Sequence, residues 1–325
     1  MNEFAVVICT HASERWIYLQ RAVRSVLRQT LPPREVVLVV DCNDVLFRRA
    51  SAALEGVHVI RNADHPGLGG ARNSGIGAST APVVAFLDDD AVASPRWLEM
   101  LASPYRDPDV SGVGGAIEPM WELGRPAWFP EEFDWVVGCT YRGMPESASE
   151  VRNLIGCNMS FRRNVLDALG RFRLGYGCDE TDLCIRLRQR WPEKKLLYLP
   201  DATVSHHVPA ARARFSRFLA RCYFEGGSKA VVSYLVGSEQ GLASERTYAR
   251  RTLPHAVLAG VETSMHNRDA AGIARSATIV LGFAATATGY IRGRTSVAQA
   301  ATRRGWSGEP FDGSALDHVR LKLRV

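Results

Sequence analysis

The sequence lacks the cysteine pattern of a disulfide-bonded or zinc-binding protein. Its 325 residues include seven cysteines, an odd number, and no two of them form a C-x-x-C pair. Scattered cysteines of this kind are typical of reduced thiols, so we expect a cytoplasmic protein without a structural zinc site. The N-terminus also shows no basic segment followed by a long apolar one, the mark of an export signal.

No apolar run reaches the ~20 residues needed to cross a bilayer. The most apolar stretch, residues 277–291, contains three threonines. Residues 1–207 carry a net charge of −3 and residues 208–325 a net charge of +9. The basic C-terminal part therefore either faces water or makes peripheral contact with an anionic membrane without spanning it. We expect no nucleic acid partner.

A dinucleotide fingerprint is absent from the first turn of the chain. The apolar residues 4–10 predict the first strand, and Thr10-His11-Ala12-Ser13 follow it without a glycine. The glycines at 67, 69 and 70 come after the third expected strand, with the wrong spacing. An NAD-dependent oxidoreductase is therefore a less favoured alternative.

What the sequence does contain is an alternation of short apolar runs and amphipathic segments. Strands are predicted at residues 4–10, 35–41, 56–61 and 82–88. A helix capped by Ser13 should follow the first strand and end before Pro32-Pro33. This pattern predicts an α/β, Rossmann-like and mostly parallel sheet flanked by helices.

The regular alternation ends near residue 118, and a chain of this length suggests more than one domain. Strand-like segments at 110–118 and 196–204 flank an acidic cluster and a helix at 183–190. We therefore expect a catalytic domain at 1–210, divided into a nucleotide-binding half (1–118) and an acceptor-binding half (119–210). A helix-rich extension should occupy 211–325.

Polar side chains gather where these strands end. Asp88-Asp89-Asp90 close the fourth strand, Asp41 closes the second, and Thr10 and His11 close the first. Because ligands bind at the carboxyl ends of parallel strands, these groups predict a site on one edge of the sheet. Adjacent carboxylates suit Mg²⁺ or Mn²⁺ on nucleotide phosphates, although an acidic triplet alone is often a solvated loop.

The ordered set of these residues, with Gly67 to Asn73 and the later acidic cluster, resembles the inverting family-2 glycosyltransferases of the GT-A fold. The resemblance covers residues 4 to about 230. It implies a nucleotide-sugar donor and a Mg²⁺ or Mn²⁺ ion held by Asp88 and Asp90. It also implies that Asp41 contacts the nucleobase of the donor. The residues expected to bind the donor are Thr10, His11, Asp41, Gly67, Arg72, Asn73, Asp88 and Asp89.

The resemblance also implies a general base in the acidic cluster. The register against Asp182 and Leu183 favours Glu180, and Asp179 stays an alternative because the order of the two acids is reversed. The third metal ligand is expected at His206, which is only slightly favoured over His207. The base would remove the acceptor proton in a single displacement that inverts the anomeric carbon.

Several features of the reaction stay open. Uridine diphosphate is favoured as the donor nucleotide, and the acceptor is a glycan, a lipid-linked molecule or a small molecule. The aromatic residues Trp121, Trp128 and Trp135 either pack in the core or form a platform for a sugar ring. A non-catalytic module that binds nucleotides or sugars is the alternative from a different functional class.

Overall fold

The computed structural model describes residues 3–174, 177–237 and 241–303. The chain forms two compact units. Unit 1 comprises Met1–Pro119, Pro145–Leu174 and Asp179–His207, and unit 2 comprises Met120–Met144, Gly175–Cys178 and Val208–Val325. The domain limits expected from the sequence stay a prediction.

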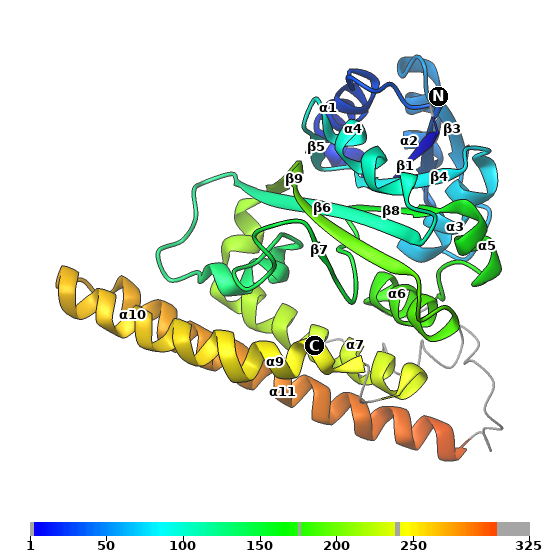
Figure 1. The fold of residues 1–325 in the computed structure, drawn as a ribbon. Coiled ribbons are helices and arrows are strands. Elements are labelled where there is room, and N and C mark those ends of the chain that lie inside the picture. Colours follow the sequence, from blue (N-terminus) through cyan, green and yellow to red (C-terminus); the bar gives the residue numbers. More distant parts are fainter. Residues whose placement is uncertain (1–2, 175–176, 238–240, 304–325) are drawn as a thin grey trace. The chain divides into compact units, whose positions relative to one another are not determined.

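Unit 1 is organised by one sheet, which begins with four parallel strands (Figure 1). Their order is β3-β2-β1-β4. Their bounds are Phe4–Thr10 for β1, Glu35–Val40 for β2, His58–Arg61 for β3 and Val83–Asp88 for β4. The inner strands are continuously buried, as expected for parallel strands covered on both faces. The parallel half of the sheet therefore confirms the α/β prediction.

The remaining strands extend the sheet in the order β8-β6-β9-β5, and β7 also pairs with β9. The pairs β4–β8, β6–β8, β5–β9 and β7–β9 are antiparallel, so the whole sheet is mixed. The bounds are Ala91–Ala93 for β5, Val110–Trp121 for β6, Ser149–Glu150 for β7, Asn158–Arg162 for β8 and Lys195–Val208 for β9.

Helices complete unit 1. One core cluster joins α3, α5 and α6 to the sheet through side chains such as Ile76, Leu166, Leu183, Val39 and Phe86. The helix bounds are Trp16–Leu27 for α1, Asp44–Ala53 for α2, Leu68–Ala78 for α3, Trp97–Ala102 for α4, Arg163–Ala168 for α5 and Asp179–Arg190 for α6.

The predicted cap at Ser13 is wrong. A 3-10 turn, η1 (Ser13–Arg15), precedes α1, so Ser13 is already inside a helical turn. Its hydroxyl oxygen instead accepts a hydrogen bond of 3.0 Å from Nδ2 of Asn43. Asn43 in turn caps α2, accepting a bond of 2.9 Å from the amide of Leu46. The two loops after β1 and β2 are thereby tied together.

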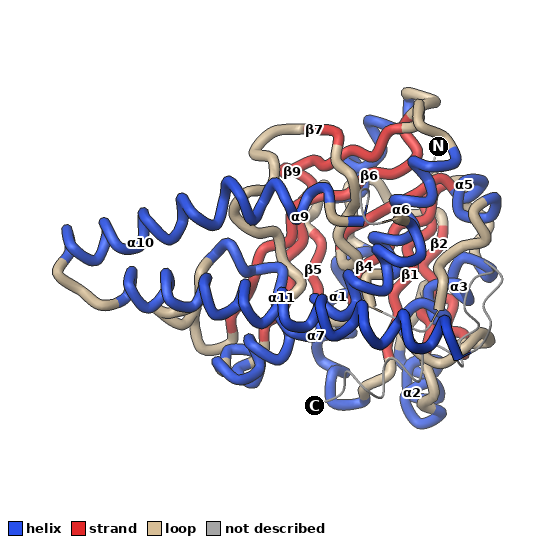
Figure 2. Tube along the Cα trace, turned by 90° about the horizontal axis from the view of Figure 1, so that it is seen from below, coloured by secondary structure: helices blue, strands red, loops and turns tan. Residues whose placement is uncertain are grey.

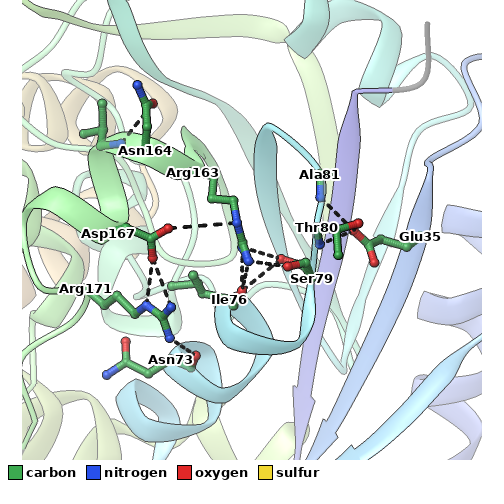
Figure 3. Close-up of polar contacts among 11 residues, drawn as sticks. Glu35, Asn73, Ile76, Ser79, Thr80, Ala81, Arg163, Asn164, Asp167 and Arg171 are labelled. Atoms are coloured by element: carbon green, nitrogen blue, oxygen red, sulfur yellow. Dashed lines mark hydrogen bonds and ion pairs between the residues drawn. The ribbon is translucent and has the colours of Figure 1, made fainter.

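A polar clamp fixes the C-terminal end of α3 (Figure 3). The guanidinium of Arg163 donates to the carbonyl oxygens of Ile76 and Ser79. The carboxylate of Glu35 accepts bonds of 2.6 and 2.8 Å from the amides of Thr80 and Ala81. The bonds from Arg163 satisfy carbonyl groups that the C-terminal end of a helix leaves without intrahelical partners, and those to Glu35 fix the segment that follows. They hold the helix that carries two of the expected donor-binding residues.

Unit 2 is helical, as the sequence predicts for the C-terminal part. Its longest helices are α7 (Phe215–Val236), α10 (Leu253–Asn267) and α11 (Ala271–Arg303). Helix α11 packs along α7, and it also packs antiparallel to α10 (Figure 2). The shorter segments are η3 (Glu131–Val137), η4 (Ala210–Ala213), α9 (Ala243–Thr247) and the π-helical η5 (Tyr248–Thr252).

All seven cysteines lie among the described residues, and none of them forms a disulfide.

Candidate active site

The middle acid of the triplet, Asp89, is buried and bound by its neighbours at the sheet edge. One of its oxygens accepts a bond of 2.6 Å from the hydroxyl of Thr10, and the other accepts one of 2.8 Å from Nη1 of Arg15. Burial raises the pKa of Asp89, although the Thr10 hydroxyl and the Arg15 charge act in the opposite direction. Asp89 and Thr10 therefore stiffen the rim. His11, the next residue, is exposed.

The last acid, Asp90, lies against His206. Nε2 of His206 is 3.0 Å from Oδ1 of Asp90, and Nη1 of Arg15 is 3.2 Å from Oδ2. This meeting follows from the register of β5 and β9, which pairs Ala91 with His206. The ring of His207 instead stacks on Tyr18, with ring centroids 4.0 Å apart. The two histidines therefore have different environments, and His206 is the one beside the acids.

The first acid, Asp88, belongs to a group that can hold a metal ion. Oxygen, sulfur and nitrogen atoms of Asp88, Cys157 and His206 lie within 4.8 Å of one another. Asp90, expected as a ligand, lies beside this group through its contact with His206. Sequence reasoning missed Cys157. Cys157 belongs to no metal-binding sequence motif. Its place beside Asp88 results from the antiparallel pairing of β4 with β8, in which Leu87 lies opposite Asn158.

Arg72, on α3, connects this group to the second acidic cluster. The buried guanidinium places Nη2 at 4.0 Å from Oδ1 of Asp88 and Nη1 at 3.3 Å from both carboxylate oxygens of Asp179. Nη2 also donates a bond of 3.2 Å to the carbonyl of Gly156. Burial opposes the charge of Arg72, but the two acids outweigh it and raise the pKa. Arg72 is thus a fixed cation in the site.

The neighbouring Asn73 has a positioning role. Its Nδ2 donates a bond of 3.0 Å to the carbonyl of Phe172, and its Oδ1 accepts one of 3.0 Å from the amide of the same residue. Nδ2 also lies 3.2 Å from Asp64. Asn73 therefore ties α3 to the segment that precedes the second acidic cluster.

The second acidic cluster begins α6. Asp179 is buried against Arg72, and the following Glu180 has a strongly altered titration. Burial, with the charge and hydrogen bond of Asp179, raises the pKa of Glu180 to about 8. Asp182 is held by Arg173 and Arg186, at 3.0 and 2.7 Å. The raised pKa makes Glu180 a candidate for proton transfer near neutral pH.

Asp41 and Gly67 are also brought together. The carboxylate of Asp41 accepts a bond of 2.8 Å from the amide of Gly67 and one of 2.7 Å from Nδ2 of Asn62. Gly67 has φ of +115°, a conformation that side chains disfavour. A Cβ at Gly70 would collide with the carbonyl oxygen of His65. These features let the loop fold tightly over the start of α3.

The three tryptophans belong to unit 2, where Trp121 and Trp128 pack on Phe129 and Trp135 packs on Phe133. Trp128 also contacts Phe218, with ring centroids 5.7 Å apart. The packing expected for them is present, and the sugar platform stays a prediction.

The sheet and its acidic rim define an α/β fold that carries a polar site at the ends of parallel strands, and comparison with known proteins identifies the family. Residues 5–170 match the model of glycosyl transferase family 2. The chain belongs to this family and is a glycosyltransferase of the GT-A fold.

The relatives extend the similarity beyond the matched segment. A glucosyl-dolichyl phosphate glucuronosyltransferase of Haloferax volcanii is 33% identical over 301 residues, which cover 89% of this chain and 95% of the relative. The succinoglycan biosynthesis protein ExoM of Rhizobium meliloti is 25% identical over 268 residues, covering 79% of this chain and 80% of that protein.

Among solved structures, the fold is similar to that of the mannosyltransferase PcManGT from Pyrobaculum calidifontis in complex with GDP-Man and Mn²⁺. The TM-score is 0.55 at 15% identity, over 86% of this chain and 85% of the other.

Proposed function

We propose that this glycosyltransferase moves a sugar from a nucleoside-diphosphate sugar to an acceptor hydroxyl by a single displacement that inverts the anomeric carbon. One observation carries the proposal. Within unit 1, Arg72 lies between the group that contains Asp88 and the pair formed by Asp179 and Glu180. The first group suits a donor diphosphate and the second suits an acceptor hydroxyl, so one site would serve both halves of the reaction.

The residues around Asp88 fit a divalent metal ion. A carboxylate, an imidazole and a thiol lie within 4.8 Å of one another. The carboxylate suits either Mn²⁺ or Mg²⁺, but the imidazole and thiol are less suited to Mg²⁺, which prefers oxygen and retains its water. The mannosyltransferase with the similar fold was solved with Mn²⁺. Such an ion, when bound, stabilises negative charge on the departing diphosphate.

Glu180 is proposed as the general base. Its carboxylate takes the proton of the acceptor hydroxyl while the hydroxyl oxygen bonds to the anomeric carbon, and the bond from that carbon to the diphosphate breaks. Because burial beside Asp179 raises the pKa of Glu180 to about 8, its ionised form is a stronger base than an ordinary carboxylate. Asp179, fixed by Arg72, is proposed to position Glu180, and a base at Asp179 is the alternative.

The similarity to the Haloferax protein guides the choice of substrates. That relative is named for glucuronosyl transfer to glucosyl-dolichyl phosphate, and the two chains align over nearly their full lengths. We therefore propose a uridine diphosphate sugar as donor, with the glucuronate first to be tested, and a lipid-linked sugar as acceptor. We propose that the enzyme is cytoplasmic and meets such an acceptor at the inner face of the membrane.

A binding screen followed by a transfer assay tests this function. Uridine, guanosine and thymidine diphosphates are compared for their effect on the melting temperature, with and without Mn²⁺, because a ligand that binds the folded state raises its stability. Uridine diphosphate with Mn²⁺ should give the largest increase. Labelled UDP-glucuronate should then transfer its sugar to a glucosyl polyprenyl phosphate, and the variant Glu180→Gln should bind donor but not transfer it. If the protein binds none of the nucleotides and consumes no donor, the proposed function is wrong.

A further inference from the structure

The outer surface of α10 and α11 in unit 2 has a composition unusual for a helix in water. The exposed side chains of α11 up to Ile291 are all uncharged. They are Ile273, Ala277, Val280, Leu281, Phe283, Ala284, Thr288 and Ile291. On α10, Leu258, Val261 and Met265 are also exposed, with one acidic residue, Glu262, exposed beside them. We call these two sets of side chains the apolar stripe.

The apolar stripe is continuous along α11. Ile273, Val280, Ala284 and Ile291 follow one another at steps of seven, four and seven residues, which places them on one side of a helix. Leu258, Val261 and Met265 likewise share one side of α10, at steps of three and four. A helix of a water-soluble protein turns such a side toward the core and puts charged residues outside.

The buried side of α11 consists mostly of small residues, with Ile279 and Val297 as its large apolar ones. A Cβ at Gly289 would collide with the carbonyl oxygen of Tyr223 on α7, and one at Gly226 of α7 would collide with the carbonyl oxygen of Thr286. Between α10 and α11, Gly260 and Gly272 meet in the same close manner. The helices thus pack closely through small residues and leave most of their large apolar side chains outside. This arrangement is typical of helices that face lipid.

Small polar groups complete the helix contacts. Oγ of Ser276 donates a bond of 2.8 Å to the carbonyl of Val257, and Oγ of Ser264 accepts one of 2.8 Å from the amide of Ile273. Antiparallel packing of α10 on α11 is therefore fixed by contacts within unit 2 (Figure 2). It does not require the outer side chains, which are left for a partner.

Charge identifies the kind of partner. Arg250 and Arg251 are exposed just before α10, and Arg292 and Arg294 are exposed on α11 where the uncharged segment ends. Arginines that flank an apolar surface suit the headgroups of anionic lipids, and each such group near a membrane contributes about 1 kcal/mol. We infer that the apolar stripe of α10 and α11 lies in the surface of an anionic lipid bilayer.

Helix α11 is long enough to cross a bilayer, since the stretch Ala271–Gln299 meets the criteria of length and composition for a spanning helix. The 15-residue run considered in the sequence is therefore only part of a longer apolar helix. Its packing nevertheless opposes a spanning position. The segment of α7 that accompanies it also carries Glu225 and Lys229, whose charged groups are 3.8 Å apart. Charged side chains are costly inside the hydrocarbon. A helix lying in the plane of the interface keeps these groups near water.

The inference is tested by flotation of the full-length protein with vesicles of neutral phosphatidylcholine and vesicles that also contain phosphatidylglycerol. The wild type should float with the anionic vesicles, and increasing salt should weaken the binding. The double variant Val280→Glu/Ile291→Glu should reduce binding by about tenfold or more, because the loss of apolar contact adds to the charge change. Both positions are already exposed, at 55% and 65%, so the fold should persist.

The matched control is Leu27→Glu/Val45→Glu in unit 1, at positions 42% and 66% exposed. It adds the same charge, so it should bind vesicles far better than the first variant. Equal binding of the two variants, or a wild type that stays unbound, would overturn the inference. If the wild type forms a dimer without lipid and the variant Val280→Glu/Ile291→Glu does not, the apolar stripe would instead bind a second copy of the chain.

Alkaline carbonate extraction tests the in-plane position. We expect it to release the protein from the vesicles, whereas retention would show that α11 spans the bilayer. Neither assay uses a donor or an acceptor, so a negative result leaves the proposed glycosyl transfer untouched.

Discussion

Replacement of Arg72 by methionine should destabilise unit 1 strongly. The guanidinium is buried, 3.3 Å from both carboxylate oxygens of Asp179, and methionine leaves that buried carboxylate without this positive charge. Loss of one partner of a buried ion pair costs about 3–5 kcal/mol. In a unit of about 200 residues, each 1 kcal/mol lowers the melting temperature by about 2–4 °C. We therefore expect a decrease of about 6–20 °C.

An exposed ion pair provides the control. Nε of Arg61 lies 2.9 Å from Oδ1 of Asp44, and both side chains are exposed to solvent. Exposed pairs contribute about 0–1 kcal/mol, so Arg61→Met should change the melting temperature only slightly. The two variants remove the same chemical group from pairs that differ in burial.

The free energy of unfolding is measured by urea unfolding of the ligand-free protein in the presence of a chelator. Circular dichroism monitors the transition. The double variant Arg72→Met/Asp179→Asn removes both charges and should recover a substantial part of the loss. Arg72→Met that is as stable as Arg61→Met would contradict the buried ion pair. A double variant whose loss equals the sum of the single losses would contradict the coupling between Arg72 and Asp179.

Four further predictions concern the acids and the thiol. The pKa of Glu180 is raised from 4.5 to about 8, so the folded protein retains a proton that the unfolded chain loses between these pH values. The stability of the wild type should therefore fall as pH rises from 4.5 to about 8. Melting curves of Glu180→Gln should show a weaker pH dependence. For the same reason kcat/KM of the wild type should increase with pH toward about 8, and a profile without that rise would argue against Glu180 as the base. Cys157→Ser should abolish the thiolate-to-metal charge-transfer absorption of the Co²⁺-loaded protein, whereas Cys42→Ser, at an exposed thiol, should retain it. Asp88→Asn should remove the Mn²⁺-dependent part of the thermal stabilisation by a nucleoside diphosphate, and an unchanged stabilisation would place the ion elsewhere.

The rim of the site could be predicted because it depends on local sequence. A buried parallel strand reads as an apolar run, and the run ends where the chain leaves the sheet. The expected first strand agrees with β1 at both ends, and Asp41 follows directly after β2. Parallel strands share an edge, so adjacent ends in the sheet bring their polar residues together. Contact between Thr10 and Asp89 is the result.

The partners of these rim residues could not be predicted, because they depend on contacts distant in sequence. Cys157 reaches Asp88 through the antiparallel pairing of β8 with β4, in a region where the sequence pattern was weak. Arg15 reaches Asp89 from the 3-10 turn that replaces the expected cap. Neither arrangement leaves a periodic signal in the sequence. The strand-like segments at 110–118 and 196–204 were expected and lie within β6 and β9, but the antiparallel pairing of this half of the sheet was not predicted, for the same reason.

Arg72 links stability to the proposed chemistry. Its positive charge lies near Asp88, Asp179 and Glu180, and it lowers the pKa of Glu180 against the larger effects of burial and of Asp179. The guanidinium thus offsets part of the repulsion between the neighbouring carboxylates of Asp179 and Glu180. A lysine at this position would retain the charge but not the planar group that faces both oxygens of Asp179 and the carbonyl of Gly156 at once. The geometry of the guanidinium, and not its charge alone, therefore joins the proposed metal-binding group to the proposed base.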